Sequence, residues 1–197
     1  RVAPLFGCAL TTAYGVVTRD ADVKPGQSVL IFGAGGVGLA IVQILELVSA
    51  YPIHVDDPVD AKVTAALERG AQVCVRERGR LGVYDVVIDT TGRSDVIERA
   101  YHLTKPHGRT ILVGVPRHDD PITIHSLPLH FCKVLTGSHG GDSKPHEDIP
   151  RLATLVRSGK LNLDGLVTHE YALDDINEAI ATVRSGTAGR VLLRLGT

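Results

Sequence analysis

The stretch that decides the fold runs from Ser28 to Gly38 and reads Ser-Val-Leu-Ile-Phe-Gly-Ala-Gly-Gly-Val-Gly. Its first half, to Phe32, is short and apolar, which is typical of a strand buried on both faces of a parallel sheet. Its second half fits the pattern G-x-G-x-x-G, and an apolar helical stretch follows from Gly36 to about Val48. A strand, a glycine turn and a helix in this order predict the first unit of a doubly wound α/β domain.

This context makes the glycine motif a candidate dinucleotide-binding site. Gly33 permits the tight turn, Gly35 lets the backbone approach a pyrophosphate, and Gly38 lets the helix pack closely on the sheet. Backbone N–H groups near Gly36 and Val37 would face the phosphates at the positive end of the helix. The alternative is a glycine-rich turn that binds no ligand.

An acidic pair follows the next expected strand, 52–55, and bears on the choice of cofactor. Asp56 would accept hydrogen bonds from the adenosine ribose and repel the extra phosphate of NADP. Asp57 adds to that repulsion, although its place directly before Pro58 also suits a helix cap. Because no arginine follows within a few residues to welcome a phosphate, the sequence favours NAD.

The rest of the chain shows two sequence patterns, one before and one after about residue 137. Up to about residue 137, short β-branched runs alternate with helical stretches, as in a parallel sheet with helices on both faces. We expect strands at 72–75, 84–88 and 109–113, edge strands at 122–124 and 134–136, and helices opened by Pro58 and capped by Ser94. Roughly six strands suit a doubly wound Rossmann sheet. Beyond Gly140-Gly141 we expect helices at 145–158 and 174–183 and a closing strand at 190–195.

Composition excludes several classes of protein. The 197 residues carry a formal net charge of −1, which gives no electrostatic reason to expect nucleic acid or an anionic membrane as partner. The uncharged run from Lys24 to Glu46 is interrupted by glycines and Gln43, so it does not indicate a membrane span. Three widely spaced cysteines indicate a reducing compartment, and we expect the cytoplasm. The chain holds no methionine, which favours a piece cut from something longer.

A series of short motifs runs in order through the whole chain. It comprises GCALTTAYG at 7–15, VKPG at 23–26, the glycine turn, DTTG at 89–92, GR at 108–109, VGVP at 113–116, INEA at 176–179 and GR at 189–190. The series resembles the zinc-dependent alcohol dehydrogenase family of the medium-chain dehydrogenases. The resemblance implies an NAD-binding Rossmann domain with a leading helix at 1–137. It also implies that 138–197 is the C-terminal return segment of a catalytic domain whose N-terminal part is absent.

The resemblance also assigns roles to single residues at the reacting end of the site. Cys8 matches the third ligand of the catalytic zinc, so the zinc site in this chain is incomplete, since a further Cys and a His would lie in the absent part. Thr12 matches a residue that lines the nicotinamide. Val113 and Val115 match positions whose backbone groups hold the carboxamide.

Two arginines receive roles at the other end of the cofactor. Arg190 matches a basic residue that reaches the pyrophosphate, where a bidentate contact suits a guanidinium. Arg93 is expected to flank the adenosine. The catalytic proton relay is expected in the absent part, so no residue of this chain is named for it.

The implied reaction is hydride transfer between NAD(H) and an alcohol, or an aldehyde or ketone in reverse. Two alternatives stay open: a zinc-free quinone or enoyl reductase of the same superfamily, which would prefer NADPH, and a non-catalytic NAD-binding module. Cys8 and Asp56 both argue against the reductase. The resemblance also implies a homodimer or homotetramer joined through the sheet edge at about 122–136, where apolar strands invite pairing.

Overall fold

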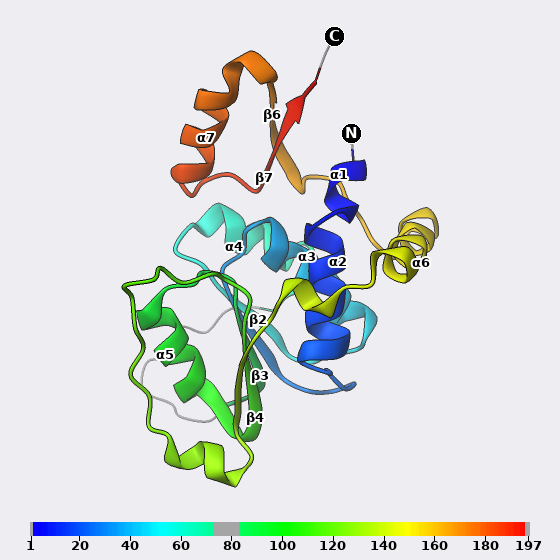
Figure 1. The fold of residues 1–197 in the computed structure, drawn as a ribbon. Helices are drawn as coiled ribbons and strands as arrows, with labels where there is room; N and C mark the ends of the chain where they lie inside the picture. The colour runs from blue at the N-terminus through cyan, green and yellow to red at the C-terminus, as the bar shows by residue number, and fades with distance from the viewer. Residues whose placement is uncertain (1, 73–82, 196–197) are drawn as a thin grey trace.

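The computed structural model describes residues 2–72 and 83–195, and its centre is a parallel sheet with helices on both faces (Figure 1). The strands are β1 (Val29–Phe32), β2 (Ile53–Asp56), β3 (Tyr84–Asp89), β4 (Thr104–Leu112) and β5 (Val134–Gly137). They lie in the order β2-β1-β3-β4-β5, and every neighbouring pair is parallel. With the parallel bridge of Gln72 to His54 on the outer side of β2, this order agrees with the doubly wound Rossmann architecture.

Strand β1 shows why its sequence is continuously apolar. Val29 and Ile31 face one hydrophobic core, whereas Leu30 and Phe32 face another on the opposite side of the sheet. Side chains alternate between the two faces of a strand, so four successive apolar residues supply both cores. All four are buried.

Helices complete both cores. The first core contains buried residues of α2 (Ala9–Gly15) and α3 (Gly36–Leu47), and the second contains residues of α5 (Ser94–Leu103). The other helices are α1 (Ala3–Phe6), α4 (Asp60–Leu67), α6 (Pro145–Arg157) and α7 (Ile176–Arg184), with short turns η1 (Val16–Asp20), η2 (Leu127–Phe131), η3 (Gly140–Asp142) and η4 (Leu173–Asp175). Among the described residues, none of the helices is both long and apolar enough to cross a bilayer.

A buried ion pair joins the leading helices to the later part of the chain. Arg19 on η1 donates through Nη2 to Oδ2 of Asp148 on α6 at 2.6 Å and through Nη1 to Oδ1 at 3.2 Å. The Asp148 carboxyl is fully buried, and the Lys144 N–H also donates to it. A bidentate pair of this kind fixes α6 against η1.

The last part of the chain forms a separate small unit, which we call the return unit. It consists of β6 (Val167–Ala172) and β7 (Arg190–Arg194), paired in parallel and connected through η4 and α7. Figure 1 shows it at one end of the molecule, beyond α4. The sequence pattern does not predict β6, because its Val-Thr-His-Glu-Tyr-Ala run is too polar for a typical buried strand.

Several sequence expectations need correction. The strand expected at 122–124 is wrong: this segment follows Pro121 without regular structure, and the Thr123 N–H donates to the Glu98 carboxylate instead of to a strand. Ser94 does not cap α5 through its side chain. The helix expected to open at Pro58 begins at Asp60.

The strand expected at 72–75 lies largely outside the described residues, as does Cys74. Only Gln72 is described there, and it forms an isolated parallel bridge with His54 of β2. The described part of the first sheet therefore has five strands where the sequence predicts roughly six.

Candidate functional site

The candidate site lies at the edge of the sheet where the parallel strands end. In the sheet, β2 lies on one side of β1 and β3 lies on the other. The chain therefore crosses over β1 between β2 and β3, and the ends of β1 and β3 mark a topological switch point. Crevices at such points are where open α/β sheets bind ligands. The glycine turn follows β1, Asp56 ends β2, and the loops after β3 and β4 complete the edge.

The glycine turn has one crowded side and one open side. Gly33 has a positive φ of 93°, and a Cβ at Gly38 would lie 2.0 Å from the Gly33 carbonyl oxygen. These values agree with the steric roles expected of both glycines. At Gly35 the backbone is ordinary (φ −74°, ψ −171°), and an added Cβ would meet nothing within 4 Å. The open side is therefore the one from which a ligand can approach the backbone.

Hydrogen bonds hold the turn against its neighbours. Asp57 accepts from the Ala34 N–H through Oδ2 at 2.8 Å and from the Val59 N–H through Oδ1 at 2.9 Å. The sequence suggested only the second contact, at the start of α4. Thr90, after β3, donates to the Phe32 carbonyl at 2.9 Å. Asp57 and Thr90 thus fix the turn from both sides of β1.

Asp56 is accompanied by an arginine that sequence reasoning missed. Its Oδ2 lies 2.7 Å from Nη1 of Arg99 on α5, and the Arg99 guanidinium lies 5.0 Å from the centre of the Phe32 ring. The two groups form a close ion pair whose geometry departs from that of a linear hydrogen bond, and Oδ2 is buried. No arginine follows Asp56 within a few residues of the sequence, but α5 brings Arg99 beside it in the fold.

Arg190 connects the return unit to the glycine turn. A Cβ built on Gly36 would lie 2.7–2.9 Å from side-chain atoms of Arg190, so this side chain passes directly over Gly36. Its Nη2 is 3.9 Å from Sγ of Cys8. Its Nε is buried and has no hydrogen-bond acceptor in the described part of the chain. Three residues singled out separately from the sequence are therefore neighbours.

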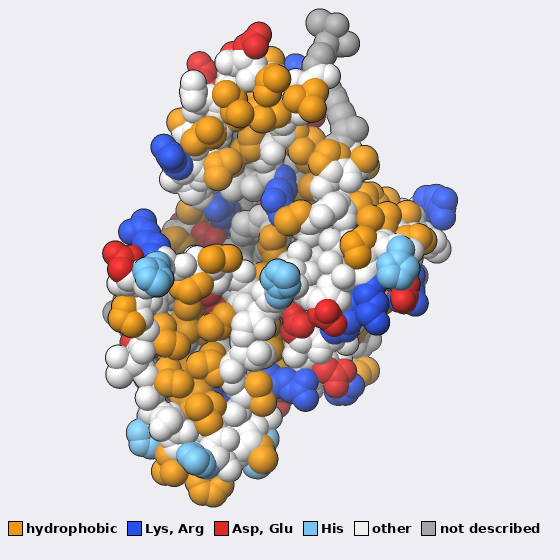
Figure 2. All heavy atoms as spheres, in the orientation of Figure 1, with side chains coloured by type: hydrophobic (Ala, Val, Ile, Leu, Met, Phe, Trp, Pro, Cys, Tyr) orange, Lys and Arg blue, Asp and Glu red, His pale blue; other side chains and the backbone are white. Residues whose placement is uncertain are grey.

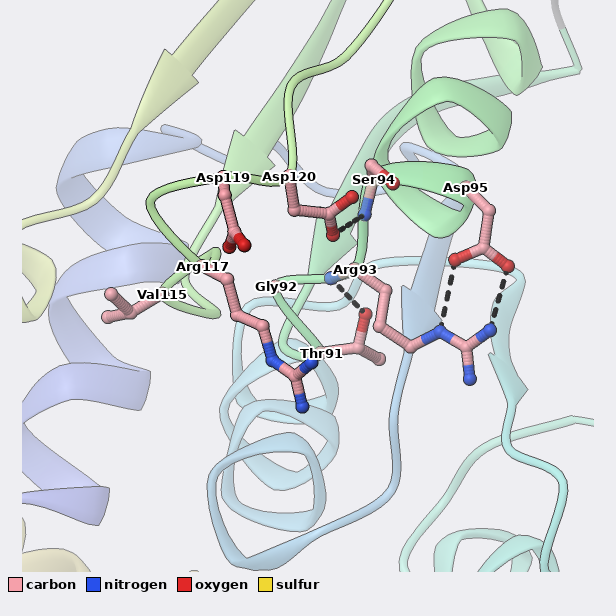
Figure 3. Close-up of a pocket in the computed structure, with 9 residues that line it drawn as sticks. All are labelled: Thr91, Gly92, Arg93, Ser94, Asp95, Val115, Arg117, Asp119 and Asp120. Carbon is pink, nitrogen blue, oxygen red and sulfur yellow. Dashed lines mark hydrogen bonds and ion pairs between the residues drawn. The ribbon is translucent and has the colours of Figure 1, made fainter.

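The loops after β3 and β4 line an open pocket of about 660 Å³ (Figure 3). Arg93 and Arg117 extend from these two loops toward the same side of the pocket. Arg93 binds both carboxylate oxygens of Asp95, at 3.0 and 2.9 Å, and this contact lowers the pKa of Asp95. Hydrogen bonds from Ser94 likewise lower the pKa of Asp120. Arg117 was not identified from the sequence, although it directly follows the VGVP motif at 113–116.

Buried Asp89 sets the conformation of both loops. Its carboxylate accepts from the Thr91 and Gly92 N–H groups at 3.0 and 2.9 Å, and its carbonyl accepts from the Val113 N–H at 2.7 Å. The Val113 N–H is thus engaged within the protein. Val115 points outward and is 90% exposed.

Cys8 and Thr12 lie at the start of α2. Cys8 is exposed and precedes the first helical residue, and the Thr12 N–H donates to its carbonyl at 2.9 Å. In the described part of the chain, no group of three or more His, Cys, Asp and Glu side chains is placed to hold a metal ion. One cysteine alone does not make a zinc site, since structural and catalytic zinc take three or four protein ligands.

Known proteins are similar to this chain in sequence. The chain is 33% identical to alcohol dehydrogenase B of Mycobacterium tuberculosis, over 98% of its own length and 55% of the relative. It is also 33% identical to geraniol dehydrogenase of Castellaniella defragrans, over 95% and 53%. The chain therefore spans about half the length of the curated relatives that it matches.

Solved structures agree. An alcohol dehydrogenase zinc-binding domain protein from Burkholderia ambifaria matches with a TM-score of 0.89 and 30% identity, over 98% of this chain and 55% of the other. Benzyl alcohol dehydrogenase from Acinetobacter calcoaceticus shares the fold with a TM-score of 0.89 and 24% identity, over 98% and 56%. A family model described as zinc-binding dehydrogenase matches residues 36–158, more than half of the chain. This chain accordingly belongs to the zinc-binding dehydrogenase family.

Proposed function

We propose that this chain is the NAD-binding portion of a zinc-dependent alcohol dehydrogenase, which transfers hydride between an alcohol, or an aldehyde or ketone, and NAD(H). One observation carries the proposal. Nε of Arg190, beside the glycine turn, is buried and has no hydrogen-bond partner among the described residues, and Oδ2 of Asp56 is met there only by the Arg99 ion pair. Buried polar atoms are normally paired, so this donor and this carboxylate fit a ligand that accepts from the one and donates to the other.

NAD offers the complementary groups. Its ribose hydroxyls can donate to Asp56, and its pyrophosphate oxygens can accept from Arg190 and from the N-terminal N–H groups of α3. Gly35 leaves the space through which the pyrophosphate would approach the backbone. When bound, NAD supplies the hydride acceptor, and the residues of this chain fix its position and orientation.

The remaining assigned residues extend this binding mode along the cofactor. We place Arg93 beside the adenosine, at the pocket of Figure 3. Thr12 and the backbone of Val113 and Val115 belong to the nicotinamide end. These contacts, like those of the glycine turn, are proposals about binding.

Cys8 is proposed as one ligand of a zinc site that the rest of the dehydrogenase completes. Its thiol is exposed and near Arg190, so it is accessible to such a site. Because one ligand does not hold zinc, no catalytic step is assigned to zinc in this chain. The 197-residue chain alone should bind NADH without oxidising alcohols, and zinc-dependent turnover of a simple alcohol by it would contradict this assignment.

Further proposals concern assembly and location. We divide the chain into a Rossmann domain at 1–137 and a return segment at 138–197. Apolar side chains of Leu127, Leu129, Phe131 and Val134 are exposed at and beside the edge strand β5, which supports a homodimer or homotetramer through this edge. Sedimentation that shows only monomer would contradict it. The free, exposed Cys8 and Cys132 agree with a reducing cytoplasm.

Nicotinamide fluorescence tests the proposed function. The sequence contains no Trp, so protein emission interferes little with a titration of NADH. We expect saturable NADH binding by the parent chain. Gly35→Val should abolish it while leaving the thermal unfolding temperature unchanged, because its side chain occupies open space and its backbone needs no strained conformation.

Gly137→Val is the matched control. Gly137 ends β5, and a Cβ there would also meet nothing within 4 Å. This variant should bind NADH as the parent does. Saturable binding by Gly35→Val equal to that of Gly137→Val would show that the glycine turn is not the cofactor site.

A further inference from the structure

The charge around Asp56 differs from what its sequence position suggests. Arg99 Nη1 lies 2.7 Å from Oδ2 of Asp56, so the carboxylate faces a guanidinium and is not an isolated negative charge. The second acidic residue, Asp57, has its carboxylate directed at two backbone N–H groups, those of Ala34 and Val59. The repulsion of a phosphate that the Asp56-Asp57 pair implies is therefore largely offset in the folded chain.

We infer that Arg99 is a specificity-determining residue of the cofactor site and lets it accept NADP(H) as well as NAD(H). The inference rests on the proposed function, because it concerns the same ribose position. In that position the carboxylate binds ribose hydroxyls, whereas a nearby arginine accommodates a 2′-phosphate. This chain holds both groups side by side.

The guanidinium is placed so that it can serve a phosphate without leaving Asp56. The side chain of Asp56 is only 13% exposed, whereas that of Arg99 is 42% exposed. The Arg99 contact with Oδ2 of Asp56 is made through Nη1. A guanidinium carries five N–H donors in a fixed fork, which suits bidentate contact with phosphate oxygens.

Phe32 holds the guanidinium at this place. Its ring lies 5.0 Å from the Arg99 Cζ, within the range of a cation–π contact, and Phe32 is the last residue of β1 before the glycine turn. The ring is itself buried in the core on the α5 side of the sheet. Arg99 is thus fixed beside the end of β1 and β2, and a lysine could not reproduce the planar stacking.

The test compares two dissociation constants, for NADH and NADPH, in the 197-residue chain by nicotinamide fluorescence. We expect the parent to bind NADPH within about tenfold of NADH, one charged contact being worth roughly a factor of ten. Arg99→Gln should weaken NADPH by about tenfold or more and NADH by less than about threefold. Arg99→Lys keeps the charge but loses the fork and the stacking, so its NADPH affinity should lie between the other two.

Arg157→Gln is the matched control, because Arg157 is an exposed arginine at the end of α6 whose loss changes the net charge equally. It should leave the ratio of the two constants unchanged. Thermal unfolding of each variant checks the fold, and Arg99→Lys replaces Arg99→Gln in the comparison if the latter does not fold.

Three results would overturn the inference. A parent chain that binds NADH more than about a hundredfold tighter than NADPH already discriminates like a bare carboxylate. Equal weakening of both cofactors by Arg99→Gln would show a structural role. Either result leaves the proposed function standing. Binding of neither cofactor by the folded parent overturns both the proposed function and this inference.

Discussion

The Rossmann sheet and the return unit differ sharply in how they are stabilised. Every residue of β1 is buried, and α3 buries nine of its twelve residues. Within the described return unit, neither β6 nor β7 contains a fully buried residue, and α7 buries only Ala179. Figure 2 shows hydrophobic side chains gathered on the surface at that end of the molecule, where Ile176, Ile180 and Val183 are exposed.

Polar contacts join the two regions, beside the packing of Val167 of β6 against the first core. The Lys62 side chain on α4 donates to the Gly186 carbonyl. Arg190 passes over Gly36. Burial is thus concentrated in the sheet, whereas the return unit, which supplies the proposed binding residue Arg190, has few buried residues of its own. The predictions below test this contrast.

Gly38→Val should have the largest effect, because it acts on the tightest contact of the Rossmann sheet. A Cβ at Gly38 would lie 2.0 Å from the Gly33 carbonyl oxygen, which belongs to the backbone of the turn and cannot move aside as a flexible side chain would. We expect the free energy of unfolding to fall by about 4 kcal/mol or more, above the usual cost of overpacking. Urea denaturation measures it.

Gly35→Ala is the matched control for this variant. It lies in the same turn, but its Cβ enters open space, so the free energy of unfolding should change by less than about 0.5 kcal/mol. Similar losses in both variants would show that the turn is sensitive to any side chain and not to the helix–turn contact.

Asp148→Asn tests the ion pair that holds α6 to the body of the molecule. The substitution leaves the partly buried Arg19 without its carboxylate, and we expect a loss of about 3 kcal/mol. Chemical denaturation at neutral pH measures the loss. Asp95 forms an exposed ion pair with Arg93, so the same substitution there, Asp95→Asn, should cost less than about 1 kcal/mol.

The pH dependence supplies a second readout of the same pair. Burial of the Asp148 carboxyl opposes its ionisation, but the hydrogen bonds from Arg19 and Lys144 outweigh burial and lower its pKa. A lowered folded-state pKa contributes stability that is present above the unfolded pKa of about 3.9 and is lost as pH falls through the folded pKa. The stability difference between parent and Asp148→Asn should therefore shrink below about pH 4. A difference that stays constant through this range would contradict the pair's contribution.

Arg190→Ala separates binding from stability in the return unit. Loss of a charged hydrogen bond to the pyrophosphate should weaken NADH binding by about tenfold. The free energy of unfolding should change by less than about 1 kcal/mol, because β7 adds little to the core. Arg194→Ala, also on β7 and exposed, is the control and should leave NADH binding unchanged. Equal binding by Arg190→Ala and the parent would remove Arg190 from the site.

The sequence was most informative where the backbone itself sets the structure. The run from Ser28 to Gly38 predicts a strand, a turn and a helix, and all three are confirmed, because buried apolar runs and glycines constrain the chain locally. Sequence patterns were wrong at 122–124 and did not predict β6. The segment 122–124 contains two isoleucines but has no partner strand, whereas β6 is polar and has no fully buried residue.

Contacts between segments distant in the sequence could not be predicted either. Asp56 could be placed at the end of β2 from its position, but Arg99 reaches it only because α5 packs across Phe32. Arg190 was assigned from a resemblance to a family, and its passage over Gly36 depends on the return unit folding back. Such pairings follow from tertiary packing, which single-sequence patterns do not encode.

The smallest expected effect belongs to Val183→Ser on α7. Val183 is 60% exposed, so replacing it should change the free energy of unfolding by less than about 0.5 kcal/mol. Val42→Ser makes the same chemical change on α3, where the side chain is fully buried, and should cost about 2–3 kcal/mol through lost packing and a buried hydroxyl. Parallel urea unfolding of the two variants gives the comparison. If Val183→Ser costs as much as Val42→Ser, the return unit is as dependent on apolar packing as the sheet, and the contrast between the two regions fails.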